Sequence, residues 1–184
     1  MQRCAWVTQD PLYIHYHDTE WGVPLYDSQK LFEFLILEGA QAGLSWITVL
    51  KNREYYRKYF DNFNPEKIAC YNSKKINSLL DNPHIIRNKL KINSAVNNSK
   101  AYLNLKQDFS AYLWDFVNDI PVRNHWKNPA EIPTTSSVSD QMSKALKQAG
   151  FSFVGSTICY AFMQAVGMVN DHLISCFRYN NMLG

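Results

Sequence analysis

The sequence NDHLISCFRY, near the C-terminus, places His172 and Cys176 four residues apart. Both are residue types that bind zinc. On a helix, positions i and i+4 share a face, so both side chains could hold one ion. The N-terminal segment supplies a second pair, Cys4 and His17, the latter after a turn expected at Asp10-Pro11. Together the four side chains would satisfy a tetrahedral Cys2His2 site, although their spacing is not that of a zinc finger.

Spacing alone leaves another interpretation open. A cysteine also packs in cores as a small apolar residue, and a histidine can simply be a polar surface residue. Cys70, Cys159 and three further histidines compete for any role as ligands. The four-residue site therefore stays a hypothesis at this point.

Composition limits the class of protein. The 184 residues suffice for one domain with a real core, and the hydrophobic content of 46% is typical of a globular protein. Four scattered cysteines do not form a disulfide framework, which favours a reducing compartment. Neither a signal peptide nor a membrane-spanning run is evident, so we expect a cytoplasmic protein. The net charge of +3 leans towards polyanionic partners, and the aromatic content of 14% favours a stacking surface.

The elements that must position these residues are predicted to be helices, because almost no stretch alternates with period two. Asp27-Ser28 caps a helix over 31–38, which GAQAG (39–43) then breaks. The segment 121–138 is polar and contains prolines, so we expect a surface loop there. The fold class is all-α, and the chain forms a single domain over residues 1–184. The other predicted helices cover 45–60, 64–71 (with Asn64 as cap and Pro65 first), 73–80, 87–106 and 110–119.

Residues 139–167 predict two helices joined by a tight hairpin. Ser139 or Asp140 caps the first helix, which ends at Gly150, and the second runs from Ser156 to Gly167. Between them, Gly155, Ser156 and Thr157 leave backbone N–H groups free at a helix N-terminus, where an anion can bind. Such a module can hold a DNA phosphate through its backbone. An ordinary tight connection between helices is the alternative.

Three separated motifs extend this pattern: HDTEWGVP (17–24), LEGAQAGLSWITVL (37–50) and GFSFVGSTICYAFMQAVGMVNDH (150–172). In this order they resemble the bacterial DNA-3-methyladenine glycosylase I family of helix-hairpin-helix base-excision enzymes, almost end to end. The resemblance implies an all-α glycosylase fold that excises 3-methyladenine from alkylated double-stranded DNA. It also implies one structural zinc per chain, joining the two termini through Cys4, His17, His172 and Cys176. We expect the protein to act as a monomer.

The chemistry of the substrate agrees with a second set of residues. Alkylation at N3 makes adenine cationic, so a pocket needs aromatic faces and a carboxylate. Glu38 lies on the apolar face of its helix, where an unpaired carboxylate is costly. The family's base pocket matches Tyr16, Glu38 and Trp46, with Tyr13 and Trp21 as neighbours. The alternatives are a glutamate at the helix end that turns to solvent and aromatic rings that serve only the core.

The position where many helix-hairpin-helix glycosylases carry a catalytic aspartate falls on Asn170 here, next to Asp171. An amide can neither act as a general base nor balance positive charge on the sugar. No lysine stands out as a Schiff-base nucleophile, so the resemblance implies a monofunctional hydrolysis by water of an already activated base.

Reaching the base requires flipping it out of the duplex. GAQAGL (39–44) is the expected break between helices, and Gln41, Gly43 and Leu44 are candidates for the wedge that fills the gap. An ordinary interhelical turn is the alternative.

Two other functions compete. A non-catalytic DNA-binding module would not need Glu38 among aromatic rings. A zinc hydrolase keeps a water on an open metal position, whereas four protein ligands close the shell and favour a structural role.

Overall fold

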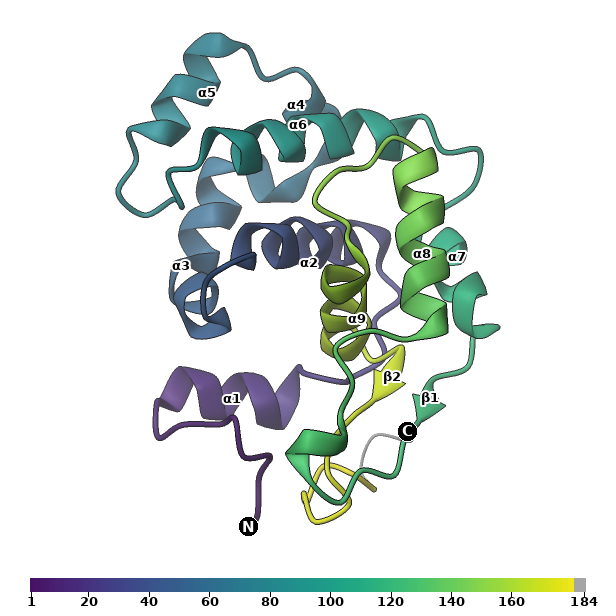
Figure 1. Cartoon of the computed structure of the whole chain (residues 1–184). Coiled ribbons are helices and arrows are strands. Elements are labelled where there is room, and N and C mark those ends of the chain that lie inside the picture. The colour runs from purple at the N-terminus through teal and green to yellow at the C-terminus, as the bar shows by residue number, and fades with distance from the viewer. Residues whose placement is uncertain (181–184) are drawn as a thin grey trace.

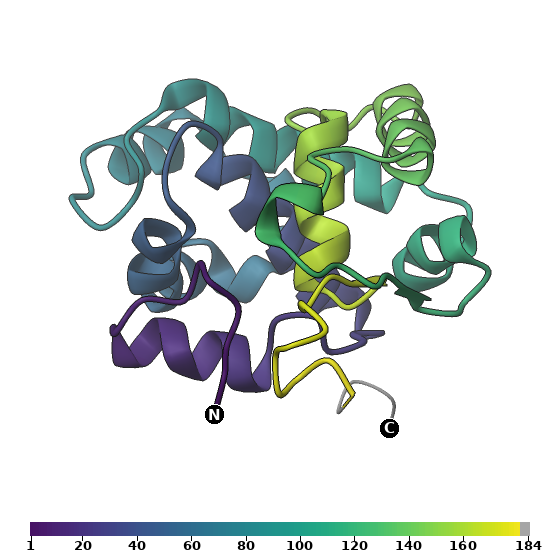
Figure 2. The same cartoon turned by 60° about the horizontal axis from the view of Figure 1, so that its bottom comes forward.

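The computed structural model describes residues 1–180 and shows a mostly helical chain (Figures 1 and 2). The all-α prediction is confirmed. Three short 3-10 turns lie at Asp61–Phe63, Asp115–Val117 and Pro129–Glu131. The helices are α1 (Pro11–Thr19), α2 (Ser28–Gln41), α3 (Trp46–Tyr59), α4 (Pro65–Ala69), α5 (Ser73–Leu80), α6 (Lys89–Leu103), α7 (Phe109–Trp114), α8 (Ser137–Gln148) and α9 (Ser156–Ala165).

Helix α2 runs through the centre of the molecule. Asp27 caps it by accepting from the backbone N–H of Lys30, as expected. Every residue from Leu31 to Ala40 is buried, because α3, α6, α7 and α9 pack around it. A helix that is buried on all sides offers its functional side chains a dry environment.

The predicted break at residues 39–43 is misplaced by three residues. Helix α2 continues through Gly39 to Gln41, and the chain turns only at Ala42 and Gly43, where φ of Gly43 is +79°. The reason is tertiary: the ammonium group of Lys91 donates to the carbonyl oxygens of Ala40 (2.8 Å) and Ala42 (2.6 Å). These bonds satisfy carbonyl groups that the end of a helix leaves without partners.

Helices α8 and α9 form the predicted hairpin, but α8 begins earlier than expected. Its N-cap is Ser136, neither Ser139 nor Asp140, and Ser136 and Ser139 exchange backbone-to-hydroxyl hydrogen bonds of 3.1 and 2.8 Å. Two candidate caps close together made the sequence ambiguous here. The C-terminal ends are as predicted: Gly150 (φ +94°) and Gly167 (φ +74°) follow the last turns of α8 and α9.

The segment 121–138 is more ordered than the predicted loop. It contains strand β1 (Val122–Arg123), which pairs in parallel with β2 (Val169–Asn170), in addition to a 3-10 turn and the start of α8. Strands of two residues are too short to leave a period-two signal. Their pairing brings the loop that follows β1 against the chain that follows β2.

Residues 171–180 form turns and irregular backbone, so the expectation that a helix presents His172 and Cys176 on one face is wrong. The side chain of Asn170 accepts from the backbone N–H of His172 (3.1 Å), and the N–H of Cys176 reaches Leu173 O (2.8 Å). These local bonds replace the helical pattern. Among residues 1–180, no helix is long and apolar enough to cross a membrane.

Candidate functional site

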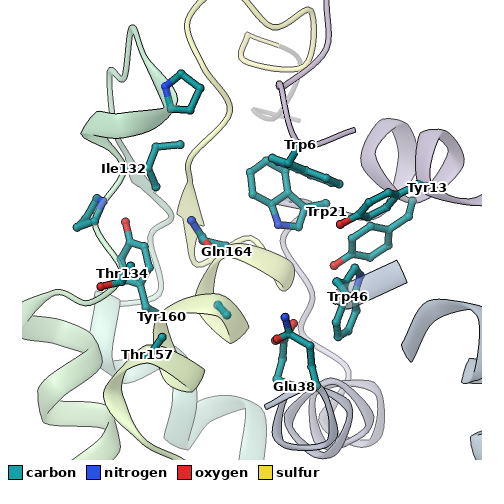
Figure 3. A pocket seen from close by; sticks show the side chains of 15 residues that line it. Trp6, Tyr13, Trp21, Glu38, Trp46, Ile132, Thr134, Thr157, Tyr160 and Gln164 are labelled. Carbon is teal, nitrogen blue, oxygen red and sulfur yellow. The ribbon is translucent and has the colours of Figure 1, made fainter. Parts of the chain in front are cut away.

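A pocket of about 420 Å³ lies between α2, α3 and the N-terminal segment on one side and α9 on the other (Figure 3). Glu38 and Gln41 enter it from α2. We call the rings on one side the aromatic wall: Trp6, Tyr13, Tyr16, Trp21 and Trp46. The opposite side is the α9 wall, formed by Thr157, Tyr160, Ala161 and Gln164, with Pro129, Ile132, Pro133 and Thr134 beside it.

Glu38 is only 3% exposed, and burial raises the pKa of its carboxyl group to about 8. Within residues 1–180 no hydrogen bond or ion pair reaches this carboxyl group. The alternative of a helix-end glutamate turned to solvent is therefore excluded, because the side chain is buried and α2 continues for three residues past Glu38. An unpaired buried carboxyl group is costly for the fold and is available to a cationic ligand.

The aromatic wall consists of rings in mutual contact. The centroids of Tyr16 and Trp46 are 5.5 Å apart, and Trp6 lies 4.9 Å from Tyr13 and 5.0 Å from Trp21. Burial raises the pKa of Tyr16, so its hydroxyl stays protonated as a donor. Within residues 1–180, the indole N–H of Trp46 is buried and has no hydrogen-bond partner. The four predicted aromatic residues thus meet in one pocket. Trp6, which the sequence interpretation missed, joins them.

The α9 wall also contains residues that were not predicted. Tyr160 is buried, Gln164 is half-buried, and both hydrogen-bond to Asp171, which is 1% exposed. Asn170 does not line the pocket: its amide donates to Tyr179 O (3.1 Å). A spacing of four residues on a helix was the one signal that could have paired Tyr160 with Gln164.

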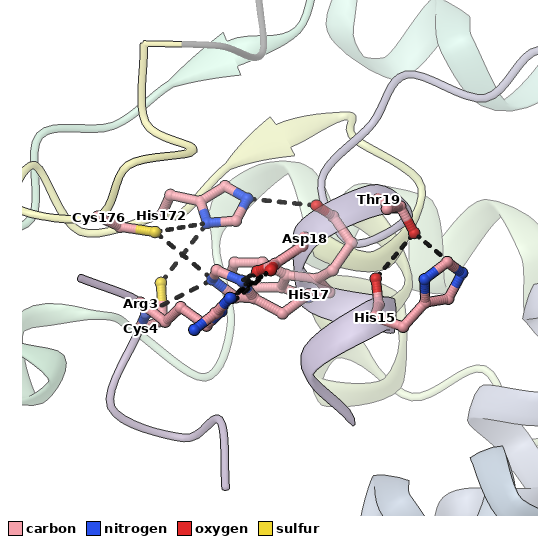
Figure 4. Close-up of polar contacts among 9 residues, drawn as sticks. Arg3, Cys4, His15, His17, Asp18, Thr19, His172 and Cys176 are labelled. Carbon is pink, nitrogen blue, oxygen red and sulfur yellow. Dashed lines mark hydrogen bonds and ion pairs between the residues drawn. The ribbon is translucent and has the colours of Figure 1, made fainter. Parts of the chain in front are cut away.

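The four predicted metal ligands converge although they come from opposite ends of the chain (Figure 4). Cys4, His17, His172 and Cys176 are buried, and one ligand atom of each lies within 4.8 Å of the others. Three sulfur-to-nitrogen distances are 3.5 Å: Cys4 Sγ to His172 Nδ1, and Cys176 Sγ to His17 Nε2 and to His172 Nδ1. With zinc–sulfur and zinc–nitrogen distances of about 2.3 and 2.1 Å, a tetrahedral site separates such atoms by about 3.6 Å. The four side chains therefore have the size of a zinc site.

Each histidine contacts a group outside the cluster with one ring nitrogen. The other ring nitrogen, Nε2 of His17 and Nδ1 of His172, faces the sulfur atoms. His17 Nδ1 lies 2.7 Å from Asp18 Oδ1, and His172 Nε2 lies 3.2 Å from the carbonyl oxygen of Trp21. Asp18 is in turn held by Arg3 through two side-chain nitrogens, at 2.8 and 2.7 Å. Carboxylate and carbonyl partners of this kind fix the orientation and tautomer of metal-binding histidines.

The two thiol groups of the cluster share a hydrogen bond. It raises the pKa of Cys4 and lowers the pKa of Cys176, which favours the thiolate form of Cys176. A cation would stabilise the second thiolate as well.

The predicted hairpin residues lie at the N-terminus of α9, and Thr157 among them lines the pocket. Gly155 is the N-cap of α9 and has an ordinary φ of −62°. Apart from its chain neighbours, no atom of residues 1–180 lies within 4 Å of where its Cβ would be. The Ser156 hydroxyl is already engaged, with Asp140 (2.5 Å) and Ser139 (2.8 Å). Thr157 is exposed and lines the pocket. Only the backbone N–H groups and Thr157 thus remain open to a phosphate.

The three wedge candidates lie together in the turn between α2 and α3. Leu44 is 41% exposed, and Gly43 is exposed beside it. Gln41 lines the pocket and donates to Leu44 O (3.3 Å). Lys91, which was not predicted, holds this turn in place through its bonds to α2.

A helix-hairpin-helix beside a pocket that joins a buried carboxyl group to aromatic rings is typical of a base-excision DNA glycosylase. Comparison with known proteins gives the same class. The methyladenine glycosylase family model matches residues 6–179, and the chain belongs to this family.

Individual relatives cover nearly the whole chain. The DNA-3-methyladenine glycosylase 1 of Escherichia coli (strain K12) is 53% identical over 182 residues, 97% of each chain. A crystal structure of a 3-methyladenine DNA glycosylase I, 52% identical, covers 96% of this chain and 98% of that one with a TM-score of 0.94. The Staphylococcus aureus enzyme, solved to explain its recognition of 3-methyladenine, is 40% identical over 96% of this chain and 95% of its own, with a TM-score of 0.92.

Proposed function

We propose that this protein flips 3-methyladenine out of alkylated DNA and hydrolyses its glycosidic bond. The observation that carries the proposal is the buried, unpaired carboxyl group of Glu38 beside the aromatic wall. A neutral base gains little from such a group, whereas a base made cationic by methylation gains an opposite charge and faces to stack on. The relatives named for 3-methyladenine support this choice of base.

In this mechanism Glu38 binds the hydrogens of the cationic ring, and Tyr16, Tyr13, Trp21 and Trp46 enclose it. The glycosidic electron pair leaves with the base, which departs as neutral 3-methyladenine. Water adds to C1′ of the sugar and its proton passes to solvent, so atoms and charge balance. None of the described pocket residues is a lysine, which agrees with a monofunctional enzyme that forms no Schiff base.

DNA contacts are assigned to two places at the rim of the pocket. The backbone at Gly155, Ser156 and Thr157 binds a phosphate at the N-terminus of α9. Gln41, Gly43 and Leu44 fill the space that the flipped base leaves, with the exposed Leu44 side chain as the apolar wedge.

The Cys2His2 cluster binds one structural zinc ion per chain. Its four protein ligands fill a tetrahedral shell, so the ion holds the fold and supplies no water to the reaction. The cluster lies behind the aromatic wall, since the rings of His17 and His172 contact Trp21 (6.2 and 4.5 Å between centroids). Zinc thereby supports the pocket without lining it.

The proposal also includes a single domain over residues 1–184, a monomer, and a location in the cytoplasm.

The test is release of free base from methylated duplex DNA by purified protein, followed by chromatography. The enzyme releases 3-methyladenine and leaves an intact abasic strand. Binding of methylated DNA without release of any base would instead establish the non-catalytic DNA-binding module.

A further inference from the structure

Asp171 lies behind the α9 wall and accepts four hydrogen bonds. Its Oδ1 receives the side-chain N–H groups of Asn124 and Trp126, both at 2.7 Å. Its Oδ2 receives the hydroxyl of Tyr160 (2.7 Å) and the amide N–H of Gln164 (2.8 Å). The carboxylate is therefore buried with both oxygen atoms satisfied, and it acts on the pocket only through the last two residues.

This network decides which atoms Tyr160 and Gln164 present to the pocket. The hydroxyl hydrogen of Tyr160 is committed to Asp171, so only its lone pairs remain. The Gln164 amide cannot flip without placing its oxygen against the Asp171 carboxylate. Its Oε1 is consequently an acceptor, and within residues 1–180 no other residue bonds to it. Both side chains line the pocket opposite Glu38 (Figure 3).

We propose that Gln164 and Tyr160 hold the attacking water, and that Asp171 is the positioning residue that fixes both as acceptors. A water that donates its two hydrogens to these acceptors keeps its lone pairs for C1′ of the sugar. As in the proposed function, on which this inference rests, the C1′–O bond forms as the base leaves with the glycosidic pair, and solvent takes the proton. Neutral groups polarised by a carboxylate thus orient the water in a pocket that Asn170 does not enter.

The first test is Gln164→Leu in single-turnover excision from methylated duplex DNA, together with binding of free 3-methyladenine. Loss of one hydrogen bond to the nucleophile lowers the rate about tenfold to a hundredfold. The affinity for the free base, which needs no water, stays within about twofold. Gln148→Leu, which changes an exposed glutamine at the end of α8, is the matched control and keeps the wild-type rate.

The outcomes separate the two proposals. If wild-type protein releases no base, the proposed function fails. If it does and Gln164→Leu matches it, or if Gln164→Leu loses rate and base affinity in equal measure, the water assignment is overturned.

The second test uses methanol as a competing nucleophile. Methanol has one hydroxyl hydrogen, so a site with two acceptors favours water, and wild-type enzyme forms little methyl glycoside at the abasic site. Gln164→Leu and Tyr160→Phe each remove one acceptor and raise the proportion of methyl glycoside. These variants carry the test because Asp171→Asn leaves buried donors unpaired and destabilises the chain. A product ratio unchanged in both variants contradicts the inference.

Discussion

At the scale of single residues, the Glu38 carboxyl group is buried without a counter-charge, which favours its neutral form until a cationic ligand binds. With a pKa of about 8, this carboxyl group is mostly protonated at pH 7 in the free pocket, and a cationic base must displace that proton. We expect the affinity for a 3-methyladenine duplex to fall about tenfold for each pH unit below 8. Glu38→Gln has no proton to lose, so its affinity stays flat. It is weaker than wild type by about ten- to a hundredfold above pH 8, and the gap narrows at pH 6. Titrations from pH 6 to 9 on both proteins check this, and parallel curves would remove Glu38 from base binding.

The Glu38 carboxyl group also makes stability depend on pH. A rise in pH strengthens the binding of a cationic base but lowers the stability of the fold. The unfolded chain loses the Glu38 proton near pH 4.5 and the folded chain only near pH 8, so stability falls as pH rises between these values. Glu38→Gln avoids this loss. We therefore expect its melting temperature to exceed that of wild type at pH 8.5, by about 2–4 °C for each kcal/mol recovered. At pH 4 the two proteins should melt together, and a variant less stable at pH 8.5 would show that the carboxyl group is paired.

At the scale of elements, the hairpin between α8 and α9 makes a clean test of phosphate binding. Gly155 has ordinary backbone angles and open space around its Cβ position, so Gly155→Val costs no more than about 1 kcal/mol as a changed helix cap. If the backbone here binds a phosphate, the valine side chain keeps DNA away and weakens binding to methylated and unmethylated duplexes by the same factor. Affinity for free 3-methyladenine stays unchanged. Normal duplex affinity in the folded variant would refute the contact.

Gly167 follows the end of α9, at a point where its backbone contacts residues 22–24. It has φ +74°, and an added Cβ would lie 2.4 Å from Pro24 N and Val23 C. Gly43 shares the unusual backbone, φ +79°, but has open space around it. We expect Gly43→Ala to cost about 1–2 kcal/mol of stability and Gly167→Ala to cost about 2–5, since it adds a backbone clash to the strain. Denaturant unfolding of both variants measures the difference, and equal costs would mean that the 22–24 segment moves aside freely.

At the scale of the whole molecule, the metal cluster closes the chain on itself. Cys4 and Cys176 lie at opposite ends of the sequence, and a cross-link over a loop of that length is worth roughly 4–5 kcal/mol in chain entropy. Cys176→Ala should lose zinc and melt about 10 °C or more below wild type. Cys70→Ala, which removes an exposed thiol outside the cluster, keeps both properties. Metal analysis and thermal melts of both variants test this prediction. Full zinc content and wild-type stability in Cys176→Ala would exclude a structural role for the zinc ion.

Local sequence patterns determined where several helices begin and end and which face of the Glu38 helix is buried. The capping residues Asp27 and Asn64 and the terminal glycines Gly150 and Gly167 indicated where helices begin and end, because those signals act over a few neighbouring residues. The apolar face of the helix that carries Glu38 could be predicted for the same reason. The motifs that resemble a known family added the four cluster residues and the base pocket, which spacing had left open.

Tertiary structure alone decided how those pieces meet. Hydrogen bonds from Lys91 stabilise α2 beyond the expected break at residues 39–43. Turns rather than a helix bring His172 and Cys176 together. The hydrogen bonds from Tyr160 and Gln164 to Asp171 could not be predicted from the sequence either. A buried polar group takes whichever donors the packed chain brings to it, and the sequence does not state which those will be.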